Sequence, residues 1–427
     1  MNVLLLGSGG REHAYALYLS QSDQVNKLYI APGNGGTEQC GVNVSLNPLD
    51  FEAVDEFCKT HEIDVVLPGN EDPLVAGIVD YFEQENATIK VAGPSKWCAQ
   101  LEGSKSFSKK FMAKYNIPTA GYKEINAQNL DEGERFLETL NPPYVLKADG
   151  LAAGKGVLIL EDLAEAKREL GQMIEGAKFG AASSTVVIEE FLKGIELSVF
   201  VVSDGNSWKL LGSAKDYKRI GEGDKGLNTG GMGAISPVPF ANAEFMAKVE
   251  EQIIIPTLSG LKTEGHPYKG ILFIGLMNDG GNPSVVEYNV RMGDPETEAI
   301  FPRLKTDMGE LIAAVANGNL DQVDLTYDTR TAATVFLVSK GYPESYEKGK
   351  EMTIPKTEDN VVLLQAGTKK TDETLVTNGG RVIAVTALEA SLKDAVNSAM
   401  GVAEQVQFSG KTYRRDIGQD LLKYQNE

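Results

Sequence analysis

The sequence predicts a multidomain protein of the α/β and α+β classes, and three patterns support this. Strand-like apolar runs alternate with helical stretches over the first hundred residues, as in a doubly wound parallel sheet. In the middle of the chain, pairs of strands flank glycine-rich loops, as in hairpins. After residue 325, three strands precede one amphipathic helix. Because 427 residues fit about three domains of ~150 residues, we place the domains at 1–102, 103–325 and 326–427.

Composition narrows the class of protein. Lys and Arg number 41 against 60 Asp and Glu, and the formal charge of −19 argues against nucleic-acid binding. Three scattered cysteines without CxxC spacing are expected to be reduced thiols, and three histidines exclude a His-rich metal site. No apolar run approaches the ~20 residues of a membrane span. The N-terminus enters a strand directly, without signal-peptide features. We therefore expect a cytoplasmic protein.

A glycine-rich turn, GSGGREHA, follows the first predicted strand. Gly9 and Gly10 allow a tight turn, and the helix that begins near Arg11 directs free N–H groups at an anion. The turn does not fit a dinucleotide site, because GxGxxG requires glycine where this chain has Glu12. The second strand also lacks the acidic residue that binds ribose. A small phosphate ligand and a purely structural turn both remain open.

The rest of the first domain continues the alternation. A second flexible loop at 31–38, which contains Asn34, follows a strand, and a strand at 63–68, a helix at 71–83 and a strand at 89–92 come next. Ligands of doubly wound sheets bind at the carboxyl ends of the strands. Both loops are therefore placed where a ligand could bind.

A basic helix is predicted at 102–119, ending before Pro118. Its lysines fit a solvated face: Lys105, Lys109, Lys110 and Lys114. Lys105 differs because it stands at the helix start, where a cation does not help the helix dipole. That position favours a phosphate partner for Lys105.

A strand carrying Lys147 leads into a loop of small residues, and a second strand starts at Val157. The loop exposes backbone N–H groups that could approach a phosphate chain, and its residues include Gly150, Ala153, Gly154, Lys155 and Gly156. The spacing is not that of a P-loop, and a strand rather than a helix follows. The pattern indicates a hairpin flap over a nucleotide, with an ordinary hairpin as the alternative.

Residues 185–202 read as strand, bend and strand. Glu189 and Glu190 stand at the bend, and Glu196 opens the next strand. In a nucleotide cleft, main-chain groups from Glu190 to Leu192 could read an adenine edge, and Glu196 could accept from ribose hydroxyls. Taken alone, these residues fit solvated loop acids better.

The long polar stretch 212–239 is rich in glycine, and long loops inside compact domains are usually functional or disordered. Asp216 and Lys218 precede the sequence NTGGMG, which contains Thr229, Gly230 and Gly231. This mixture suits a small zwitterionic or phosphorylated substrate.

The stretch SVVEYNVRMGDPETE, residues 284–298, begins as a strand that pairs with the apolar strand at 270–277. Because side chains alternate along a strand, Glu287, Asn289 and Arg291 share one face. A carboxylate and an amide oxygen two positions apart can bind one Mg²⁺, and Arg291 beside them could hold a phosphoryl group. The following turn presents Asp294. On its own, the motif fits a solvated edge strand better.

The C-terminal region carries strands at 332–338, 361–367 and 380–387. Ser391 and Asp394 resemble a capping box that starts an amphipathic helix. The segment GKTYRRDIG (410–418) could contact an anion or cap the fold.

The combined motifs resemble the phosphoribosylamine–glycine ligase (glycinamide ribonucleotide synthetase) family of the ATP-grasp superfamily. The resemblance covers nearly the whole chain and is carried by GSGGREHA (7–14), PGNGGT (32–37), QLEGSKSFSK (100–109), KADGLAAGKGV (147–157), EEFLKGIELS (189–198), NTGGMG (228–233), YNVRMGDPETE (288–298) and YRRDIG (413–418).

This resemblance implies a fold and a reaction. An N-terminal substrate domain would precede an ATP-grasp domain with a lid subdomain at about 120–192, and a small α+β domain would follow. ATP would phosphorylate glycine, and the amine of 5-phospho-β-D-ribosylamine would attack the glycyl phosphate, as a step of purine biosynthesis. Partners would be these small molecules, with no nucleic acid or membrane, and we expect a monomer.

The resemblance also assigns roles to residues. Glu287 and Asn289 would bind Mg²⁺ or Mn²⁺, and Arg291 would steady the acyl phosphate. Groups around ATP would be Lys105, Lys147, the flap from Gly150 to Gly156, Glu189, Glu190, Leu192 and Glu196. Groups facing the substrates would be Gly9, Gly10, Arg11, Glu12, Asn34, Lys218, Thr229, Gly230 and Gly231. Asp216 and Asp294 would lie near the substrate amines.

The chain departs from the family pattern at several positions. The family usually has DHKR, PNTGGMG and NCRFGDPETQ, where this chain has Tyr217, Leu227 and, in the last motif, Val290, Met292 and Glu298. Related enzymes also place a metal-binding Glu on the preceding strand, in the region of Met277. These differences bear on the substrate loop and on the number of metal ligands.

Three alternatives remain open. The chain could be an ATP-grasp ligase for another carboxylate, such as a carboxyphosphate-forming enzyme of the same pathway. It could be a nicotinamide-dependent oxidoreductase, which Glu12 argues against. It could also be a non-catalytic nucleotide-binding module, which the intact face of Glu287, Asn289 and Arg291 argues against.

Overall fold

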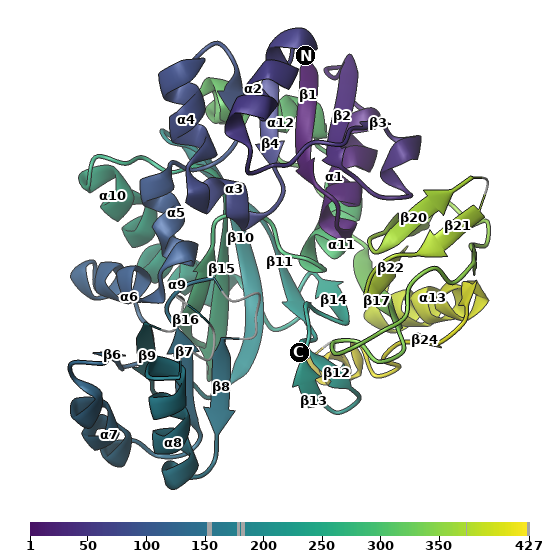
Figure 1. Ribbon diagram of the computed structural model, residues 1–427. Coiled ribbons are helices and arrows are strands. Elements are labelled where there is room, and N and C mark those ends of the chain that lie inside the picture. Colours follow the sequence, from purple (N-terminus) through teal and green to yellow (C-terminus); the bar gives the residue numbers. More distant parts are fainter. Residues whose placement is uncertain (152–155, 177–179, 181–183, 373, 425–427) are drawn as a thin grey trace.

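Five parallel strands form the N-terminal sheet of the computed structural model, whose labelled strands are at the top of Figure 1. The structure describes residues 1–151, 156–176, 180, 184–372 and 374–424. The strand order β3–β2–β1–β4–β5 confirms the predicted doubly wound sheet. The elements are β1 (Asn2–Gly7), α1 (Gly10–Ser20), β2 (Lys27–Pro32), β3 (Val42–Asn43), α2 (Phe51–Thr60), β4 (Val65–Pro68), α3 (Glu71–Ala76), α4 (Ile78–Glu85) and β5 (Lys90–Val91).

Two helices replace the single helix that was predicted at 71–83. Gly77 adopts φ +102°, ends α3 and begins α4. Residues with a Cβ atom rarely adopt this left-handed backbone conformation, whereas glycine adopts it freely. The prediction of one continuous helix was therefore wrong at this glycine.

The predicted basic helix at 102–119 is also divided. Residues 102 and 103 end α5 (Lys96–Gly103), and Ser104 caps α6 (Lys105–Lys114) by accepting the N–H of Phe107 at 3.0 Å. A serine in extended conformation is a favourable helix N-cap. Lys105 is therefore the first residue of α6, as expected from its position after Gly103 and Ser104.

A separate four-stranded sheet with order β6–β9–β7–β8 lies at the lower left of Figure 1. Its elements are β6 (Tyr122–Asn126), α7 (Leu130–Thr139), β7 (Tyr144–Ala148), β8 (Val157–Leu160), α8 (Leu163–Ile174) and β9 (Thr185–Glu189). Strands β7 and β8 are antiparallel, with Lys147 opposite Val157, which confirms the predicted hairpin. Its own apolar core includes Leu146, Leu170 and Ile188. We refer to this unit as the lid sheet.

The largest sheet continues across the domain boundary that was predicted at residue 325. Its main path is β16–β15–β10–β11–β14–β17–β22–β19, and β14 joins β17 with Ala234 opposite Thr334. The bounds are β10 (Ile195–Asp204), β11 (Trp208–Asp216), β14 (Gly233–Ser236), β15 (Lys269–Asp279), β16 (Asn282–Asn289), β17 (Thr331–Ser339), β19 (Val361–Gln365) and β22 (Arg381–Glu389). The last two parts of the chain therefore share one sheet.

Helices pack on this sheet, and short strands form small separate pairs or, in the case of β24, pair with β17. The helices are α9 (Ala243–Val249), a π-helical turn η3 (Glu250–Ile254), α10 (Ile255–Thr263), α11 (Glu296–Ile300), α12 (Met308–Asn317) and α13 (Leu392–Gln405). The short strands are β12 (Arg219–Gly221), β13 (Lys225–Asn228), β18 (Met352–Thr353), β20 (Thr368–Thr371), β21 (Thr374–Thr377), β23 (Gln407–Phe408) and β24 (Lys411–Thr412). Ser391 caps α13 by accepting the N–H of Asp394, as predicted.

Candidate active site

Strand β16 places a carboxylate among three lysines. Burial opposes ionisation of Glu287, but the charges of Lys218, Lys147 and Lys105 together hold the pKa of its carboxyl below the usual range. Lys218 Nζ lies 3.9 Å from Glu287 Oε1. The lysines come from α6, β7 and the segment after β11, so distant parts of the chain converge on β16. Glu287 is therefore an ionised carboxylate within a cationic site.

The predicted common face of Asn289 and Arg291 is present. Arg291 Nη2 donates to Asn289 Oδ1 at 3.2 Å, whereas the Tyr288 hydroxyl lies 2.6 Å from the Thr257 hydroxyl. Because Tyr288 directly precedes Asn289 in sequence, its different partner fits the alternation of strand side chains. The side chains of Asn289 and Arg291 therefore occupy one region.

Arg291 also binds two acids that the sequence analysis did not single out. Its guanidinium donates to Glu71 Oε2 at 3.0 Å and to Glu102 Oε1 at 2.7 Å. Burial raises the pKa of Glu102 to about 7, although Arg291 opposes that shift. Glu71 starts α3 and Glu102 lies near the end of α5, so Arg291 joins β16 to the N-terminal part. Spacing alone could not have revealed this contact.

The strand before β16 offers no second acidic ligand opposite Glu287. The residue paired with Glu287 is Gly275, and Met277 pairs with Ser284 and Glu196 instead. Met277 therefore lies on the strand that pairs with β16, two residues from the partner of Glu287, and it is not an acid. The register shifts between Gly275 and Leu276, and such bulges cannot be read from an apolar run.

Lys147 belongs to a buried ion cluster. Its Nζ donates to Glu189 Oε2 at 3.0 Å and to the Val286 carbonyl at 3.2 Å. Lys109 Nζ lies 3.1 Å from the same Glu189 oxygen. The sequence placed Lys109 on a solvated face, but its side chain is 2% exposed, whereas Lys110 is 64% exposed. Glu189, from β9, draws Lys109 inward and fixes Lys147 beside β16.

Lys105 lies near the predicted flap. Its Nζ donates to the Gly150 carbonyl at 3.4 Å, and burial lowers the pKa of its ammonium group. Gly156, at the other end of the loop, accepts the N–H of Ala148 at 2.7 Å. The predicted flap residues Ala153, Gly154 and Lys155 lie outside the described residues.

The predicted nucleoside residues follow β9. The backbone N–H of Glu190 donates to the Gly121 carbonyl at 2.9 Å, and its carboxylate accepts the N–H of Gly121 at 3.1 Å. Leu192 is exposed to an intermediate degree. Glu196, at the start of β10, is hydrogen-bonded to Lys218, which in turn faces Glu287.

A second acidic pair adjoins Lys218. Burial raises the pKa of Asp216, and the charge of Glu196 adds to this against the opposing charge of Lys218. Burial and the charge of Asp216 raise the pKa of Glu296 to about 7, although Ser198 Oγ donates to Glu296 at 3.1 Å. The site thus contains acids with distinct proton affinities.

The glycine turn is held by protein groups. Gly9 N–H donates to Glu12 Oε2 at 2.6 Å, and Arg11 Nε donates to Glu12 Oε1 at 2.6 Å. Arg11 N–H donates to Asp294 Oδ2 at 3.4 Å, which brings the acidic turn after β16 to the start of α1. Asn34 Nδ2 donates to the carbonyls of Ser8, Gly9 and Gln365 at 2.9, 3.2 and 2.9 Å.

Arg381 connects the two predicted substrate loops and was missed by the sequence analysis. Its Nη1 donates to the Gly230 and Asp294 carbonyls at 2.7 and 2.8 Å, and its Nη2 lies 3.0 Å from Asp294 Oδ1. Thr229 Oγ1 donates to the Lys218 carbonyl at 2.8 Å, and Gly231 adopts φ +114° against Pro295. The GGRV sequence carries no signal for a contact with Asp294.

Tyr217 and Leu227, two of the residues that differ from the family pattern, differ in their burial. The Tyr217 side chain is buried, donates to Asp420 Oδ1 at 2.6 Å and accepts the N–H of Gly418 at 2.9 Å. Leu227 is 50% exposed on β13. Arg414 is buried and bonds Asp224 and Asp416, so it fastens the β12–β13 hairpin and caps the fold.

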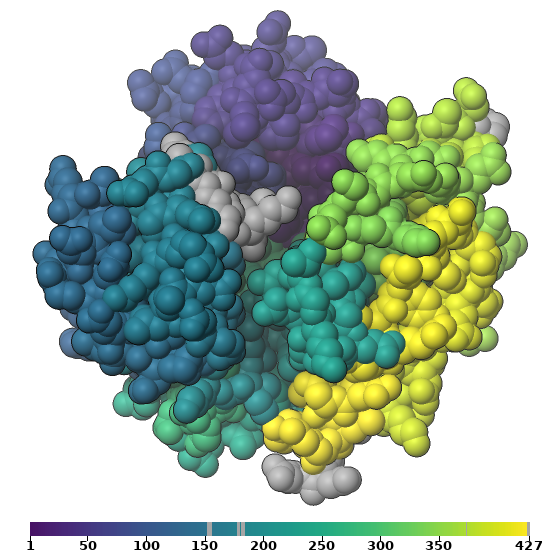
Figure 2. Space-filling view, turned by 60° about the horizontal axis from the view of Figure 1, so that its bottom comes forward, coloured from purple at the N-terminus to yellow at the C-terminus, as the bar shows by residue number. Residues whose placement is uncertain are grey.

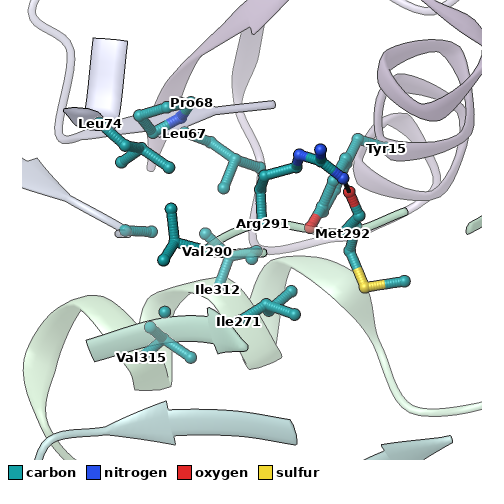
Figure 3. Close-up of a pocket in the computed structure, with 12 residues that line it drawn as sticks. Tyr15, Leu67, Pro68, Leu74, Ile271, Val290, Arg291, Met292, Ile312 and Val315 are labelled. Carbon is teal, nitrogen blue, oxygen red and sulfur yellow. Dashed lines mark hydrogen bonds between the residues drawn. The ribbon is translucent and has the colours of Figure 1, made fainter. Parts of the chain in front are cut away.

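Figure 2 shows a hollow between the N-terminal part, the lid sheet and the C-terminal half of the chain. A separate cavity of about 20 Å³ lies beneath Arg291, and Figure 3 shows its apolar lining from β4, α3 and α12, including Leu67, Leu74 and Ile312. That space holds about one water molecule, so it is an interdomain packing defect and not a substrate pocket.

Two structural features are absent from the described part of the chain. None of its helices is both long enough and apolar enough to cross a membrane. It also contains no cluster of three or more His, Cys, Asp or Glu side chains able to hold a metal ion. A metal at β16 would therefore depend on Glu287, Asn289 and oxygens of a ligand.

The lid sheet with Lys147, facing a long sheet that carries Glu287 and Asn289, defines an ATP-grasp enzyme. Family models of phosphoribosylglycinamide synthetase match residues 1–102 (N domain), 103–297 (ATP-grasp (A) domain) and 332–420 (C domain). The chain therefore belongs to the phosphoribosylglycinamide synthetase family.

Similar proteins cover nearly the whole chain. The phosphoribosylamine--glycine ligase of Chlorobaculum tepidum is 45% identical over 429 residues, covering 99% of this chain and 100% of the relative. The protein of the same name from Haemophilus influenzae is 45% identical over 423 residues, covering 98% of each. A crystal structure of phosphoribosylamine--glycine ligase from Thermotoga maritima matches with a TM-score of 0.84 and 37% identity, covering 98% of this chain and 100% of that one.

Proposed function

We propose that this protein uses ATP to join glycine to 5-phospho-β-D-ribosylamine through a glycyl phosphate, giving glycinamide ribonucleotide, ADP and phosphate in purine biosynthesis. The observation that carries the proposal is the convergence of Lys105, Lys147 and Lys218 on Glu287 in a chain of this family. Such a cluster suits a reaction in which a phosphoryl group moves between anionic oxygens.

The residues at β16 fit a divalent cation. Glu287 is ionised because the surrounding lysines outweigh the effect of burial. Asn289 follows two residues later on the same strand, so its amide oxygen lies on the same face as the Glu287 carboxylate. Carboxylate and amide oxygens are hard ligands of the kind that Mg²⁺ and Mn²⁺ accept. Glu287 and Asn289 would hold the cation, which would neutralise charge on the ATP phosphates.

The lysines would bind and orient the nucleotide. Lys147 is fixed by Glu189 and the Val286 carbonyl, so its ammonium group is pre-positioned beside β16. Lys105 approaches from the start of α6, near Gly150 of the flap. Preorganised cations of this kind stabilise a phosphoryl transition state without reorganisation during the reaction. Glu190, Leu192 and Glu196 would hold the nucleoside.

The acceptor side would use the acidic turn and the glycine turn. Arg291 would steady the acyl phosphate, while Asp216 and Asp294 would hold the substrate amino groups because carboxylates bind ammonium groups strongly. The phosphoribosylamine would lie near Gly9, Gly10 and the first turn of α1. Lys218 and the 229–231 backbone would complete the substrate side.

The test is phosphate release from ATP and Mg²⁺, with glycine and freshly prepared phosphoribosylamine added singly and together. The proposal expects release only when both are present, with one ADP formed per amide. Release with bicarbonate and without glycine would assign another carboxylate to the same fold. ATP binding without release for any carboxylate–amine pair would contradict a ligase and favour a nucleotide-binding module.

A further inference from the structure

Glu298 is a fully buried acid in the short helix α11, and no role in the proposed reaction uses it. Its carboxyl group lies at the start of α1. A Cβ atom on Gly10 would collide with Glu298 Oε1, and the ring of Phe336 on β17 is the next neighbour of that position. Glu298 therefore lies where the acidic turn, the glycine turn and the C-terminal half of the sheet meet.

The neighbour of Glu298 is the carboxyl group of Asp294. The two side chains are within hydrogen-bonding range of each other. Among the described residues, neither Glu298 oxygen has a hydrogen-bond partner, and Asp294 Oδ1 has only the ion pair with Arg381 at 3.0 Å. Two carboxylates are acceptors only, whereas one protonated carboxyl group can donate to the other. A single proton between them satisfies both groups.

The charges around the pair decide which group is protonated. Burial opposes ionisation of Asp294, but Arg381 from β22 and Arg11 from α1 hold the pKa of its carboxyl below the usual range. Burial and the charge of Asp294 raise the pKa of Glu298 well above its usual range, and Arg381 opposes this only in part. Strands β14 and β17, which also pack on α11, carry no charged side chain. Strand β11 packs on α11 as well and carries Lys215, which lies 3.2 Å from Asp420, and Asp216, whose charge acts on Glu296. Arg303, from the turn after α11, donates to the Arg330 carbonyl. The proton therefore belongs to Glu298.

We propose that Glu298 is a positioning residue, which keeps the shared proton and thereby fixes Asp294 against Gly9 and the first turn of α1. The protonated pair carries a single negative charge, which Arg11 and Arg381 can balance. Loss of the proton would add a second negative charge beside the turn to which the proposed function assigns phosphoribosylamine. That charge would repel the phosphate group, so the consequence for substrate binding rests on the proposed function.

The proton itself can be tested without activity. Infrared difference spectra of wild type minus Glu298→Gln at neutral pH should contain a carboxylic-acid carbonyl band, whereas wild type minus Glu244→Gln should not, because Glu244 is exposed. Asp294→Asn is the second variant. This substitution removes the charge that raises the pKa of Glu298. The carboxylic-acid band of Glu298 should therefore vanish at a lower pH in Asp294→Asn than in wild type. The same spectrum for wild type and Glu298→Gln would overturn the proposal.

The effect on the reaction has its own readout. As rising pH removes the proton from Glu298, the KM of wild type for phosphoribosylamine should increase at least roughly fivefold, while the KM for ATP stays constant. Glu298→Gln keeps a donor without a titrating proton, so its KM should stay flat. Parallel KM profiles in the two proteins would overturn the positioning role. Absence of phosphoribosylamine turnover in every protein would contradict the proposed function, while the infrared result would still decide the protonation of Glu298.

Discussion

The β16 side of the site and the glycine-turn side hold their functional residues differently. On β16, the carboxylate of Glu287 faces Lys218 at 3.9 Å and stays charged through the surrounding lysines. At the glycine turn, Glu12 and Asn34 are already engaged by close hydrogen bonds within the protein. Glu287 is arranged to receive ligand charges, whereas the side chains of Glu12 and Asn34 frame the glycine turn from within the protein. Substitutions should therefore affect activity in the first region and stability in the second.

The largest effect is expected for Glu287→Ala. Removing the carboxylate that we propose binds the metal should lower kcat at least about a hundredfold. The unfolding free energy should change by less than about 0.5 kcal/mol, because Glu287 is not tied down by close protein contacts. Steady-state kinetics and urea unfolding measure the two effects. Asn282→Ala, at the exposed end of the same strand, is the matched control. A marked loss of stability in Glu287→Ala would remove the contrast between the two regions.

The next effect concerns pH and His13 on α1. Its buried Nδ1 accepts the N–H of Gln365 at 2.7 Å, and burial lowers the pKa of the imidazole to about 4. The folded state therefore prefers the neutral ring. The resulting stabilisation is complete above the ordinary imidazole pKa of 6.5 and is lost as pH falls through about 4.

This loss should amount to at most about 3 kcal/mol of unfolding free energy. It should be absent from His13→Gln, whose side chain does not titrate. Urea unfolding at a series of pH values compares the two proteins. Equal slopes of stability against pH in wild type and variant would show that His13 does not contribute.

Asn34→Ala should lower the unfolding free energy by about 2 kcal/mol. The change leaves the carbonyls of Ser8, Gly9 and the buried Gln365 without the amide donor that joins the turn to Gln365. The KM for ATP should not change. Asn47→Ala, at an exposed position, serves as the control in thermal unfolding. Loss of phosphoribosylamine binding with unchanged stability would instead show that Asn34 contacts the ligand directly. Asn34 would then belong with the ligand-binding residues and not with those that stabilise the turn.

The smallest effect is expected for Tyr217→Phe. The variant loses the hydroxyl contacts to Asp420 and Gly418, which should cost about 1 kcal/mol of unfolding free energy. Because those contacts fasten the substrate loop from behind, kcat/KM should change less than about threefold. A larger loss of kcat/KM would place the hydroxyl in substrate recognition.

Strand alternation made the β16 site predictable from the sequence. The period of two fixed Asn289 and Arg291 on one face, and the loop of small residues placed Lys147 on a hairpin. The same reasoning failed where conformation or remote partners decided. Gly77 breaks a helix through its own φ, which the periodic apolar pattern does not contain. In the β15–β16 hairpin, Val286 is an extra residue of β16, and the apolar run does not reveal this bulge.

The remaining contacts depend on residues that the fold alone brings together. Lys109 fits a solvated helix face in sequence, but Glu189 from β9 pairs with it in the interior. Arg381 reaches Asp294 from 87 positions away. Local patterns cannot predict such pairs, because nothing in a single sequence specifies which charges meet across a sheet. The frame around the glycine turn therefore became visible only in the structure.

The proposed reaction passes through a phosphorylated glycine carboxylate. Turnover of glycine labelled with heavy oxygen in its carboxylate tests this, with mass spectrometry of the phosphate and the amide. Attack by the amine on glycyl phosphate breaks the carbonyl–oxygen bond, so one labelled oxygen should appear in the released phosphate and one should remain in the amide. Phosphate without label, formed while amide accumulates, would contradict the acyl-phosphate route and the role assigned to the lysines around Glu287.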